Sequence, residues 1–266
     1  MNKKVGFIGC GNMGSAMVGG LIKSKFLEAD DIIVSTKTEE SAKKLKDQFG
    51  IETTLDSKLV AKESDVIILA VKPFMYKEMI SKIKSELSKD KLIITIAAGI
   101  SISNMEEWIG ENAKIIRTMP NTPALVGQAM SAVCPNGNIS DEELNYCVKI
   151  FQSFGECVQL EEKDFHAFTA LCGSSPAYVY MFIEAMADAA VKLGIPRAKA
   201  YKMAAQSVLG SSKMVLETGK HPGELKDAVC SPAGTTIEAV VELERLGFRN
   251  SVIQAIDKCA EKSKNM

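Results

Sequence analysis

Residues 4–14 of this chain read Lys-Val-Gly-Phe-Ile-Gly-Cys-Gly-Asn-Met-Gly. The run Lys4–Ile8 is typical of a buried strand, and a helical pattern of apolar residues follows the glycines. Gly9, Gly11 and Gly14 have the spacing of a dinucleotide-binding turn. In such a turn the first glycine makes the bend, the second lets the backbone approach a pyrophosphate, and the third lets a helix pack on the strand. This stretch predicts a strand–turn–helix unit that binds a dinucleotide. The alternative is a glycine-rich turn for some other phosphate.

Working outward, short β-branched runs alternate with helical patterns through the first part of the chain, which favours parallel strands joined by crossover helices. The predicted strands are Lys4–Ile8, Asp31–Val34, Val66–Val71, Leu92–Ala97, Ile115–Thr118, Ser131–Cys134 and Cys157–Leu160. The first five predict a doubly wound sheet. The last two flank a helix at whose start Ser140 and Glu143 have capping-box spacing.

No strand pattern appears from Asp164 onward, and the predicted helices are 177–193, 197–218, 235–246 and 249–262. The fold class is therefore α/β, with an N-terminal Rossmann-type doubly wound sheet over residues 1–163 and an all-helical C-terminal domain over 164–266. Helix 177–193 is apolar apart from one narrow stripe of Glu184, Asp188 and Lys192. That pattern suggests burial against a partner subunit, although a central core helix with one solvated edge fits it equally well.

Composition excludes several classes of function. The net charge of −1 gives no drive toward nucleic acid or anionic lipid, and no stretch is long and apolar enough to predict a membrane span. Seven scattered cysteines fit neither a disulfide framework nor a zinc site, and no residues have metal-ligand spacing. These features predict a cytoplasmic protein with reduced thiols and no metal.

The end of the second predicted strand bears on cofactor choice. An NAD-binding unit places a carboxylate there for the ribose, whereas this chain has Ser35, Thr36 and Lys37. Hydroxyls and a cation can hold a 2′-phosphate, so the sequence favours NADPH over NADH. In the alternative, Lys37 is only a solvated loop charge and Asp30 or Glu39 turns toward the ribose.

Small residues end the next two strands, at Ala70-Val71-Lys72 and Ala97-Ala98-Gly99. Doubly wound sheets bind ligands at these carboxyl edges, and small side chains leave room for a ribose or nicotinamide. The following strand leads into Met119-Pro120-Asn121-Thr122-Pro123, where Asn121 is expected to face the cleft.

Residues 221–239 place a small, hydroxyl-rich turn between two apolar helical patterns. Pro232 is expected to block a helix and Gly234 to adopt an unusual backbone angle. Thr235 and Thr236 are expected to cap the next helix while exposing amide donors to an anion. Such a turn could seat a small carboxylate, and the alternative is a helix N-cap with no further role.

Five segments carry a resemblance to a known family. They are the glycine turn, Ala70-Val71-Lys72-Pro73, Met119-Pro120-Asn121-Thr122-Pro123, Gly173-Ser174-Ser175-Pro176-Ala177-Tyr178 and the segment 221–238. Taken in this order, they closely resemble the pyrroline-5-carboxylate reductase family over nearly the whole chain. The last segment is the most specific. The resemblance implies reduction of the cyclic imine of pyrroline-5-carboxylate to L-proline, the last step of proline biosynthesis, with hydride from NADPH or NADH. It also implies self-association through the helical domain into dimers and, in many members, decamers.

The resemblance also implies roles for individual residues. Thr236 matches the threonine near the imine nitrogen; Ser231, Gly234 and Thr235 match the turn that takes the substrate carboxylate; and Glu162 aligns with an acid near the ring. The residues with implied or predicted cofactor contacts are Ile8, Gly9, Cys10, Gly11, Asn12, Met13, Gly14, Ser35, Thr36, Lys37, Ser57, Ala70, Val71, Lys72 and Ala98.

Two residues depart from the family pattern: Ala233 stands where many members have glycine, and Ala228 where some have asparagine. We expect both to adjust affinity and not to abolish activity. Two rival functions stay open from the sequence. One is a related reductase acting on a six-membered imine or a 3-hydroxy acid, and the other is a regulator that binds NADP(H) without turnover.

Overall fold

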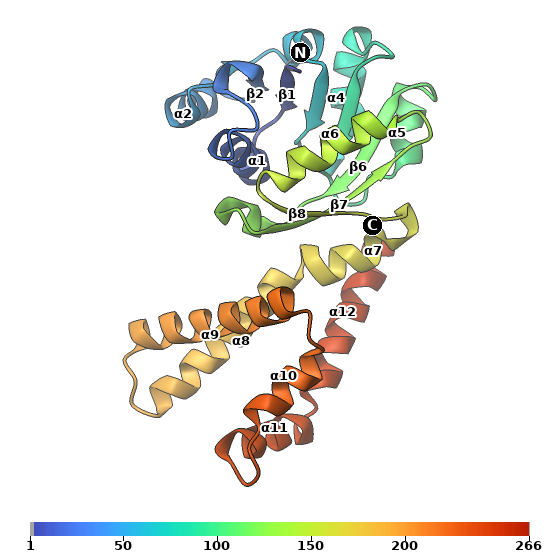
Figure 1. Ribbon diagram of the computed structural model, residues 1–266. Coiled ribbons are helices and arrows are strands. Elements are labelled where there is room, and N and C mark those ends of the chain that lie inside the picture. Colours follow the sequence, from blue (N-terminus) through green and yellow to red (C-terminus); the bar gives the residue numbers. More distant parts are fainter. Residues whose placement is uncertain (1–2, 266) are drawn as a thin grey trace. The chain divides into compact units, whose positions relative to one another are not determined.

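The computed structural model describes residues 3–265 and contains one eight-stranded sheet with the strand order β3-β2-β1-β4-β5-β6-β7-β8 (Figure 1). The strands are β1 Val5–Ile8, β2 Ile32–Ser35, β3 Glu52–Thr54, β4 Val66–Leu69, β5 Leu92–Thr95, β6 Lys114–Met119, β7 Ala129–Pro135 and β8 Gly155–Gln159. All neighbouring pairs are parallel except β6 and β7. The first six strands therefore have the doubly wound order, with the switch point between β1 and β4.

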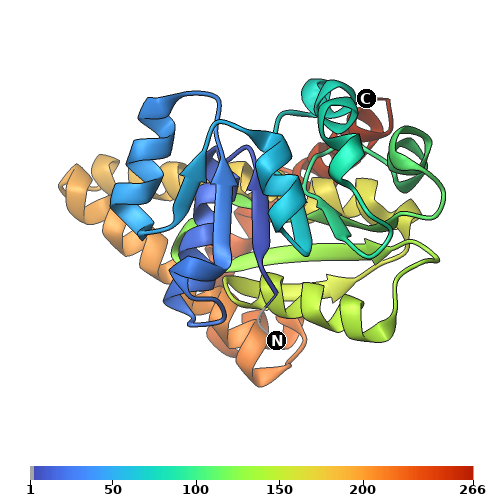
Figure 2. The same ribbon diagram turned by 90° about the horizontal axis from the view of Figure 1, so that it is seen from above.

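Helices cover both faces of this sheet (Figure 2). They are α1 Asn12–Lys23, α2 Glu39–Phe49, α3 Ser57–Glu63, α4 Tyr76–Ile83, α5 Ile102–Ile109 and α6 Asp141–Gln152. Alternate residues of each central strand point to opposite faces, so Val66 and Ile68 join the core beneath α1 and α6 while Ile67 and Leu69 join the core beneath α4 and α5. The predicted capping box of α6 is confirmed, since Ser140 and Glu143 bond reciprocally.

The remaining described elements are helical: α7 Phe165–Phe168, a π-helical turn Thr169–Gly173, α8 Ser175–Lys192, α9 Arg197–Thr218, α10 Pro222–Val229, α11 Thr235–Arg245 and α12 Phe248–Lys264. The α/β sheet followed by an all-helical region confirms the predicted fold class. Helix α7 and the π-helical turn precede the first helix predicted in this region, and β3 and α10 were not predicted either. Strand β3 has no apolar alternation, and α10 begins at Pro222, where the sequence analysis expected only a turn.

The chain divides into two compact units. One comprises the residues up to Ser174 together with those from Cys259, and the other comprises Ser175–Lys258. Phe165 and Phe168 of α7 belong to the first unit, where they pack against the sheet residues Ala132 and Cys134. The end of α12 belongs to the sheet-containing unit, where His166 Nδ1 lies 3.0 Å from the hydroxyl oxygen of Ser263.

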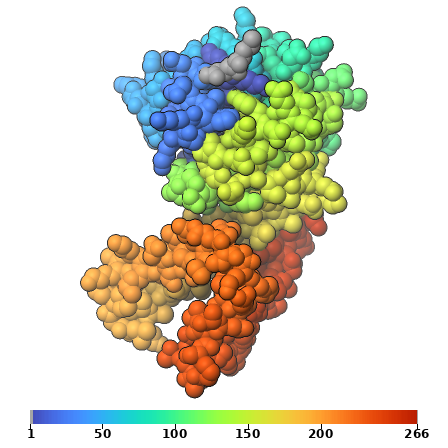
Figure 3. Space-filling model, in the orientation of Figure 1, coloured from blue at the N-terminus to red at the C-terminus, as the bar shows by residue number. Residues whose placement is uncertain are grey.

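The helical unit buries little of its own apolar surface. Figure 3 draws the residues of the helical unit in orange to red. Helices α8 and α9 pack along each other, with only Ala187 buried on α8 and only Ala200 and Ala204 buried on α9. Large apolar side chains are exposed throughout the unit: Val179, Tyr180, Met181, Phe182, Leu193, Tyr201, Met203, Leu209, Met214, Leu216, Val229, Val241, Leu243, Leu246, Phe248, Val252 and Ile253. Apolar exposure on this scale marks an interaction surface, which agrees with the partner subunit expected for helix 177–193.

Candidate active site

The glycine turn lies at the carboxyl end of β1. Gly9 has φ +79°, and a Cβ there would lie 2.6 Å from Val71 Cγ1 and 3.0 Å from the carbonyl oxygen of Ala70, so only glycine fits. Gly14 is buried, and a Cβ on it would meet the side chains of Cys10 and Ala70, as expected where a helix packs on the sheet.

Gly11 differs from the other two glycines, because a Cβ there would meet no atom within 4 Å. It is the N-cap of α1 but offers no side-chain cap, and no acidic residue occupies the first turn. The first backbone N–H groups of α1 therefore have no capping side chain, and the helix dipole favours an anion there. This cradle fits a pyrophosphate.

Cys10 and Met13 pack against the core below the turn, while Asn12 is exposed at its surface. Burial raises the pKa of the Cys10 thiol to about 12, so the thiol stays protonated and is not a nucleophile. Ile8 is fully buried, so its part in any cofactor contact falls to its backbone.

At the end of β2, the predicted ribose-binding residues have different environments. Ser35 is buried, and its hydroxyl oxygen lies 3.2 Å from that of Ser57, the first residue of α3. Thr36 donates its hydroxyl to the carbonyl of Thr38 at 2.9 Å, whereas Lys37 is exposed. Of these side chains only that of Lys37 projects into solvent, where it can meet a phosphate.

At the ends of β4 and β5 lie Ala70, Val71, Lys72 and Ala98, which the sequence placed at one edge. The parallel pairing of β1 with β4 brings Ala70–Lys72 beside the glycine turn, and the pairing of β4 with β5 places Ala98 one strand further along the same edge. The backbone N–H of Ala70 donates to the carbonyl of Ile8 at 2.9 Å, which fixes one segment to the turn. The predicted cofactor-binding residues are thus gathered along the carboxyl edge of β1, β2, β4 and β5.

Asn121 does not face an open cleft, in contrast to the expectation. Its side-chain amide donates to the carbonyl of Cys172 at 2.9 Å and accepts from the backbone N–H of Met130 at 3.0 Å, and the residue is 8% exposed. Both ends of the amide are used to hold the loop after β6 against β7 and the π-helical turn.

Glu162 is engaged inside the sheet-containing unit. Its Oε1 accepts from Arg117 Nη1 at 2.7 Å and from the backbone N–H of Ile102, the first residue of α5, also at 2.7 Å. The Arg117 guanidinium is almost buried and stacks on the Phe165 ring at 4.7 Å. Through Oε1 this carboxylate joins β6 and α5, while its side chain remains 34% exposed.

Glu162→Gln is expected to lower the free energy of unfolding by about 1–2 kcal/mol, because it leaves the nearly buried Arg117 without its countercharge. The KM for the substrate should stay within about twofold of the wild-type value, since the change affects packing and not the ligand. Urea denaturation together with steady-state kinetics checks this. A large rise in KM with unchanged stability would assign Glu162 to the substrate instead.

In the helical unit, residues 230–234 connect α10 to α11. His221 Nδ1 accepts from the Gly223 N–H at 3.0 Å and caps α10, which ends at Val229. The N–H of Gly234 then donates to the carbonyl of Ser231 at 3.0 Å, closing a turn with Pro232 second and Ala233 third. Ala233 has φ +56°, so the turn has the residue order and the positive third φ of a type II turn.

This geometry corrects two expectations. Gly234 has an ordinary extended backbone with φ −83°, and the unusual angle falls on Ala233. Glycine is required at 234 for space, because a Cβ there would lie 2.3 Å from the hydroxyl oxygen of Ser231. Thr235 and Thr236 are the first two residues of α11 and do not cap it, since Gly234 is the N-cap and makes no side-chain hydrogen bond.

The consequence is an uncapped helix start. The first N–H groups of α11 lack intrahelical partners, and they lie next to the Ser231 and Thr235 hydroxyls on an exposed turn. Within residues 3–265 the Thr236 hydroxyl makes no hydrogen bond. The segment therefore offers backbone N–H donors for a carboxylate, and the Thr236 hydroxyl lies in the same first turn of α11.

Ala233→Gly is expected to raise the free energy of unfolding by about 0.5–1 kcal/mol, because it relieves the cost of a left-handed alanine, reduced by the added freedom of glycine in the unfolded chain. Denaturation midpoints of the variant and the wild type provide the measurement. A destabilised variant would show that Ala233 is not strained.

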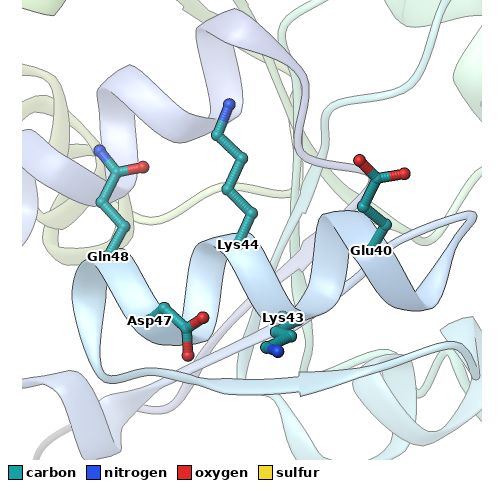
Figure 4. Close-up of a pocket in the computed structure, with 5 residues that line it drawn as sticks. All are labelled: Glu40, Lys43, Lys44, Asp47 and Gln48. Carbon is teal, nitrogen blue, oxygen red and sulfur yellow. The ribbon is translucent and has the colours of Figure 1, made fainter.

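The surface hollow on α2 offers no competing site. The hollow drawn in Figure 4 is lined by Glu40, Lys43, Lys44, Asp47 and Gln48, all from the exposed surface of α2. Among the described residues there is no group of three or more His, Cys, Asp or Glu side chains suited to a metal ion, and no helix is long and apolar enough to cross a membrane. All seven cysteines are free thiols.

Two family models match the chain. Residues 162–266 match "Pyrroline-5-carboxylate reductase dimerisation", and residues 4–99 match "NADP oxidoreductase coenzyme F420-dependent". The chain is 52% identical to the pyrroline-5-carboxylate reductase of Escherichia coli K12, covering 100% of this chain and 99% of that protein. It is 43% identical to the Methanosarcina acetivorans enzyme of the same name, covering 100% of this chain and 98% of that protein.

Solved structures agree. A pyrroline-5-carboxylate reductase from Coxiella burnetii superposes with a TM-score of 0.93 at 31% identity, covering 100% of this chain and 98% of that one. The Plasmodium falciparum pyrroline carboxylate reductase, solved with NADP bound, superposes with a TM-score of 0.90 at 34% identity, covering 99% of this chain and 98% of that one.

The doubly wound sheet and its glycine turn define an oxidoreductase of the class that uses a nicotinamide dinucleotide. The dimerisation model covers the helices with unburied apolar surface, so the helical region self-associates. Over its full length the chain belongs to the pyrroline-5-carboxylate reductase family.

Proposed function

We propose that this protein reduces 1-pyrroline-5-carboxylate to L-proline with hydride from NADPH, and with NADH as a less favoured donor. The observation that carries the proposal is the uncapped start of α11, where amide donors and the Ser231, Thr235 and Thr236 hydroxyls meet on one turn. An anionic ring with a polar C=N bond matches that set of donors.

The residues of the turn bind and orient the imine. Amide donors at the start of α11 and the Ser231 hydroxyl hold the carboxylate, while the Thr236 hydroxyl hydrogen-bonds the ring nitrogen. The bound nicotinamide supplies hydride to the C=N carbon. The nitrogen takes one proton, so imine, NADPH and H⁺ give proline and NADP⁺. A protonated imine is already electrophilic, so orientation contributes more than a strong acid.

The sheet unit holds the cofactor in this proposal. The turn built on Gly9, Gly11 and Gly14 receives the pyrophosphate at Gly11. Ala70–Lys72 and Ala98 flank the nicotinamide half, and Thr36 and Lys37 lie at the ribose of the adenosine half. Support for NADPH comes from the absence of a carboxylate at residues 35–38, where Lys37 is the one charge. The experiment is a comparison of kcat/KM for the two cofactors, and a higher value for NADH would overturn the preference.

Assembly and location complete the proposal. Self-association through the helical unit gives a dimer or a larger ring such as a decamer, and size-exclusion chromatography with light scattering distinguishes them. Seven reduced thiols and a net charge of −1 support a cytoplasmic location.

A further inference from the structure

A buried chain of hydroxyl groups joins the carboxyl ends of three neighbouring strands. The hydroxyl of Thr118, on β6, donates to the carbonyl of Thr95 at 2.8 Å, and the hydroxyl of Thr95, on β5, donates to the phenol oxygen of Tyr76 at 3.0 Å. The phenol donates in turn to the carbonyl of Leu69, the last residue of β4, at 2.5 Å. Tyr76, Thr95 and Thr118 are at most 1% exposed. We call these three side chains the hydroxyl chain.

The hydroxyl chain lies where the strand ladder stops. The paired residues of β4 and β5 end at Leu69 and Thr95, so the segments Ala70–Lys72 and Ile96–Ala98 beyond them are not paired with each other. The phenol fixes the first segment at its base, and the Ala97 N–H approaches the Thr95 hydroxyl at 3.4 Å. The separation of the two segments therefore depends on these hydrogen bonds.

The side chain of Tyr76 otherwise packs as an apolar ring of α4 in the core, beside Ile80 and Ile83. A phenylalanine would fill nearly the same volume without burying a hydroxyl, which is costly unless it is bonded. Burial raises the pKa of Tyr76 to about 12, so the phenol stays a donor across the physiological range.

We propose that Tyr76 is a positioning residue that holds the segments Ala70–Lys72 and Ile96–Ala98 at the separation required by the nicotinamide half of the cofactor. The inference rests on the proposed function, because that function places the nicotinamide between these segments. The adenosine half would lie over β1 and β2, which the hydroxyl chain does not touch. Tyr76 therefore acts on one half of the ligand only.

The test compares two ligands by titration calorimetry at a temperature where every variant is folded. In Tyr76→Phe the Kd of NADPH should rise about tenfold, whereas the Kd of adenosine 2′,5′-bisphosphate, which carries only the adenosine half, should stay within about twofold. General loosening of the fold would move both values together.

Thr95 supplies an independent variant. Thr95→Val keeps the shape of the side chain but removes the hydroxyl, so it should reproduce the selective loss of NADPH binding, whereas Thr95→Ser keeps the hydroxyl and should restore binding. The double variant Tyr76→Phe/Thr95→Val should bind NADPH about as weakly as either single variant, because both break one chain.

Tyr146→Phe is the matched control. The Tyr146 hydroxyl is also buried, but it has no hydrogen-bond partner among the described residues. Its ring lies under the Lys3 ammonium at 4.9 Å, near the amino end of β1 and thus at the opposite edge of the sheet. NADPH binding should be unchanged in this variant.

The outcomes separate the two claims. Unchanged NADPH binding in Tyr76→Phe and Thr95→Val, or equal weakening of both ligands, would overturn the positioning role and leave the proposed function standing. If the wild-type protein binds neither NADPH nor NADH, the proposed function itself fails. If Tyr76→Phe does not fold, the comparison of NADPH binding by Thr95→Val and Thr95→Ser tests the positioning role instead.

Discussion

Thr236→Ala is expected to lower kcat/KM for pyrroline-5-carboxylate about 100-fold while the Kd of NADPH stays unchanged. The Thr236 hydroxyl lies in the first turn of α11 beside the uncapped amide donors, and it is the group available to orient the ring nitrogen. Losing one orienting hydrogen bond allows the C=N carbon to move from its position over the nicotinamide, and misplacement on the scale of 1 Å costs about this factor.

Thr236→Ser removes the methyl group and keeps the hydroxyl, so this variant should retain most of the wild-type activity. Calorimetric titration with NADPH supplies the binding control. Turnover by Thr236→Ala equal to that of the wild type would remove Thr236 from the mechanism. Equal losses in turnover and NADPH binding would point to a damaged fold.

Gly11→Ala is expected to raise the Kd of NADPH about 100-fold with little change in Tm. The backbone of Gly11 has φ −79°, which any residue can adopt, and a Cβ there meets no protein atom within 4 Å. The added methyl group would instead occupy space where the pyrophosphate approaches the turn. NADPH titration and thermal unfolding together make the measurement.

Gly9→Ala provides the contrast. Its φ of +79° and the 2.6 Å approach to Val71 Cγ1 predict a loss of about 2–4 kcal/mol in the free energy of unfolding. Substitution of Gly11 should therefore weaken cofactor binding, whereas substitution of Gly9 should lower the stability of the fold. NADPH binding by Gly11→Ala at wild-type strength would contradict the assignment of the cradle.

Sequence patterns predicted the apolar strands and the glycine turn because both are local. Strand β3 was missed since Glu-Thr-Thr has no apolar alternation, and its pairing with β2 depends on tertiary contact. Helix α10 was missed because Pro222 and Gly223 were interpreted as a turn, although proline also favours the first position of a helix.

The candidate site was predicted as a set of segments and less well as individual side chains. The order of parallel strands brings the predicted cofactor residues to one edge, which sequence periodicity anticipates. The partners of Glu162 and Asn121 are distant in sequence, so neither the Arg117 ion pair nor the bond to Cys172 could be expected. Ala233 took the left-handed angle because type II geometry requires it at the third position of the Ser231–Gly234 turn.

The most direct measurement of the central claim is the stoichiometry of the reaction. Purified protein is mixed with NADPH and pyrroline-5-carboxylate, NADPH loss is followed by absorbance, and L-proline is quantified by chromatography, with the six-membered imine in parallel. We expect one L-proline per NADPH oxidised and slower turnover of the larger ring. NADPH binding without oxidation would contradict the account and favour a regulator, and faster reduction of the six-membered imine would assign the site to a different substrate.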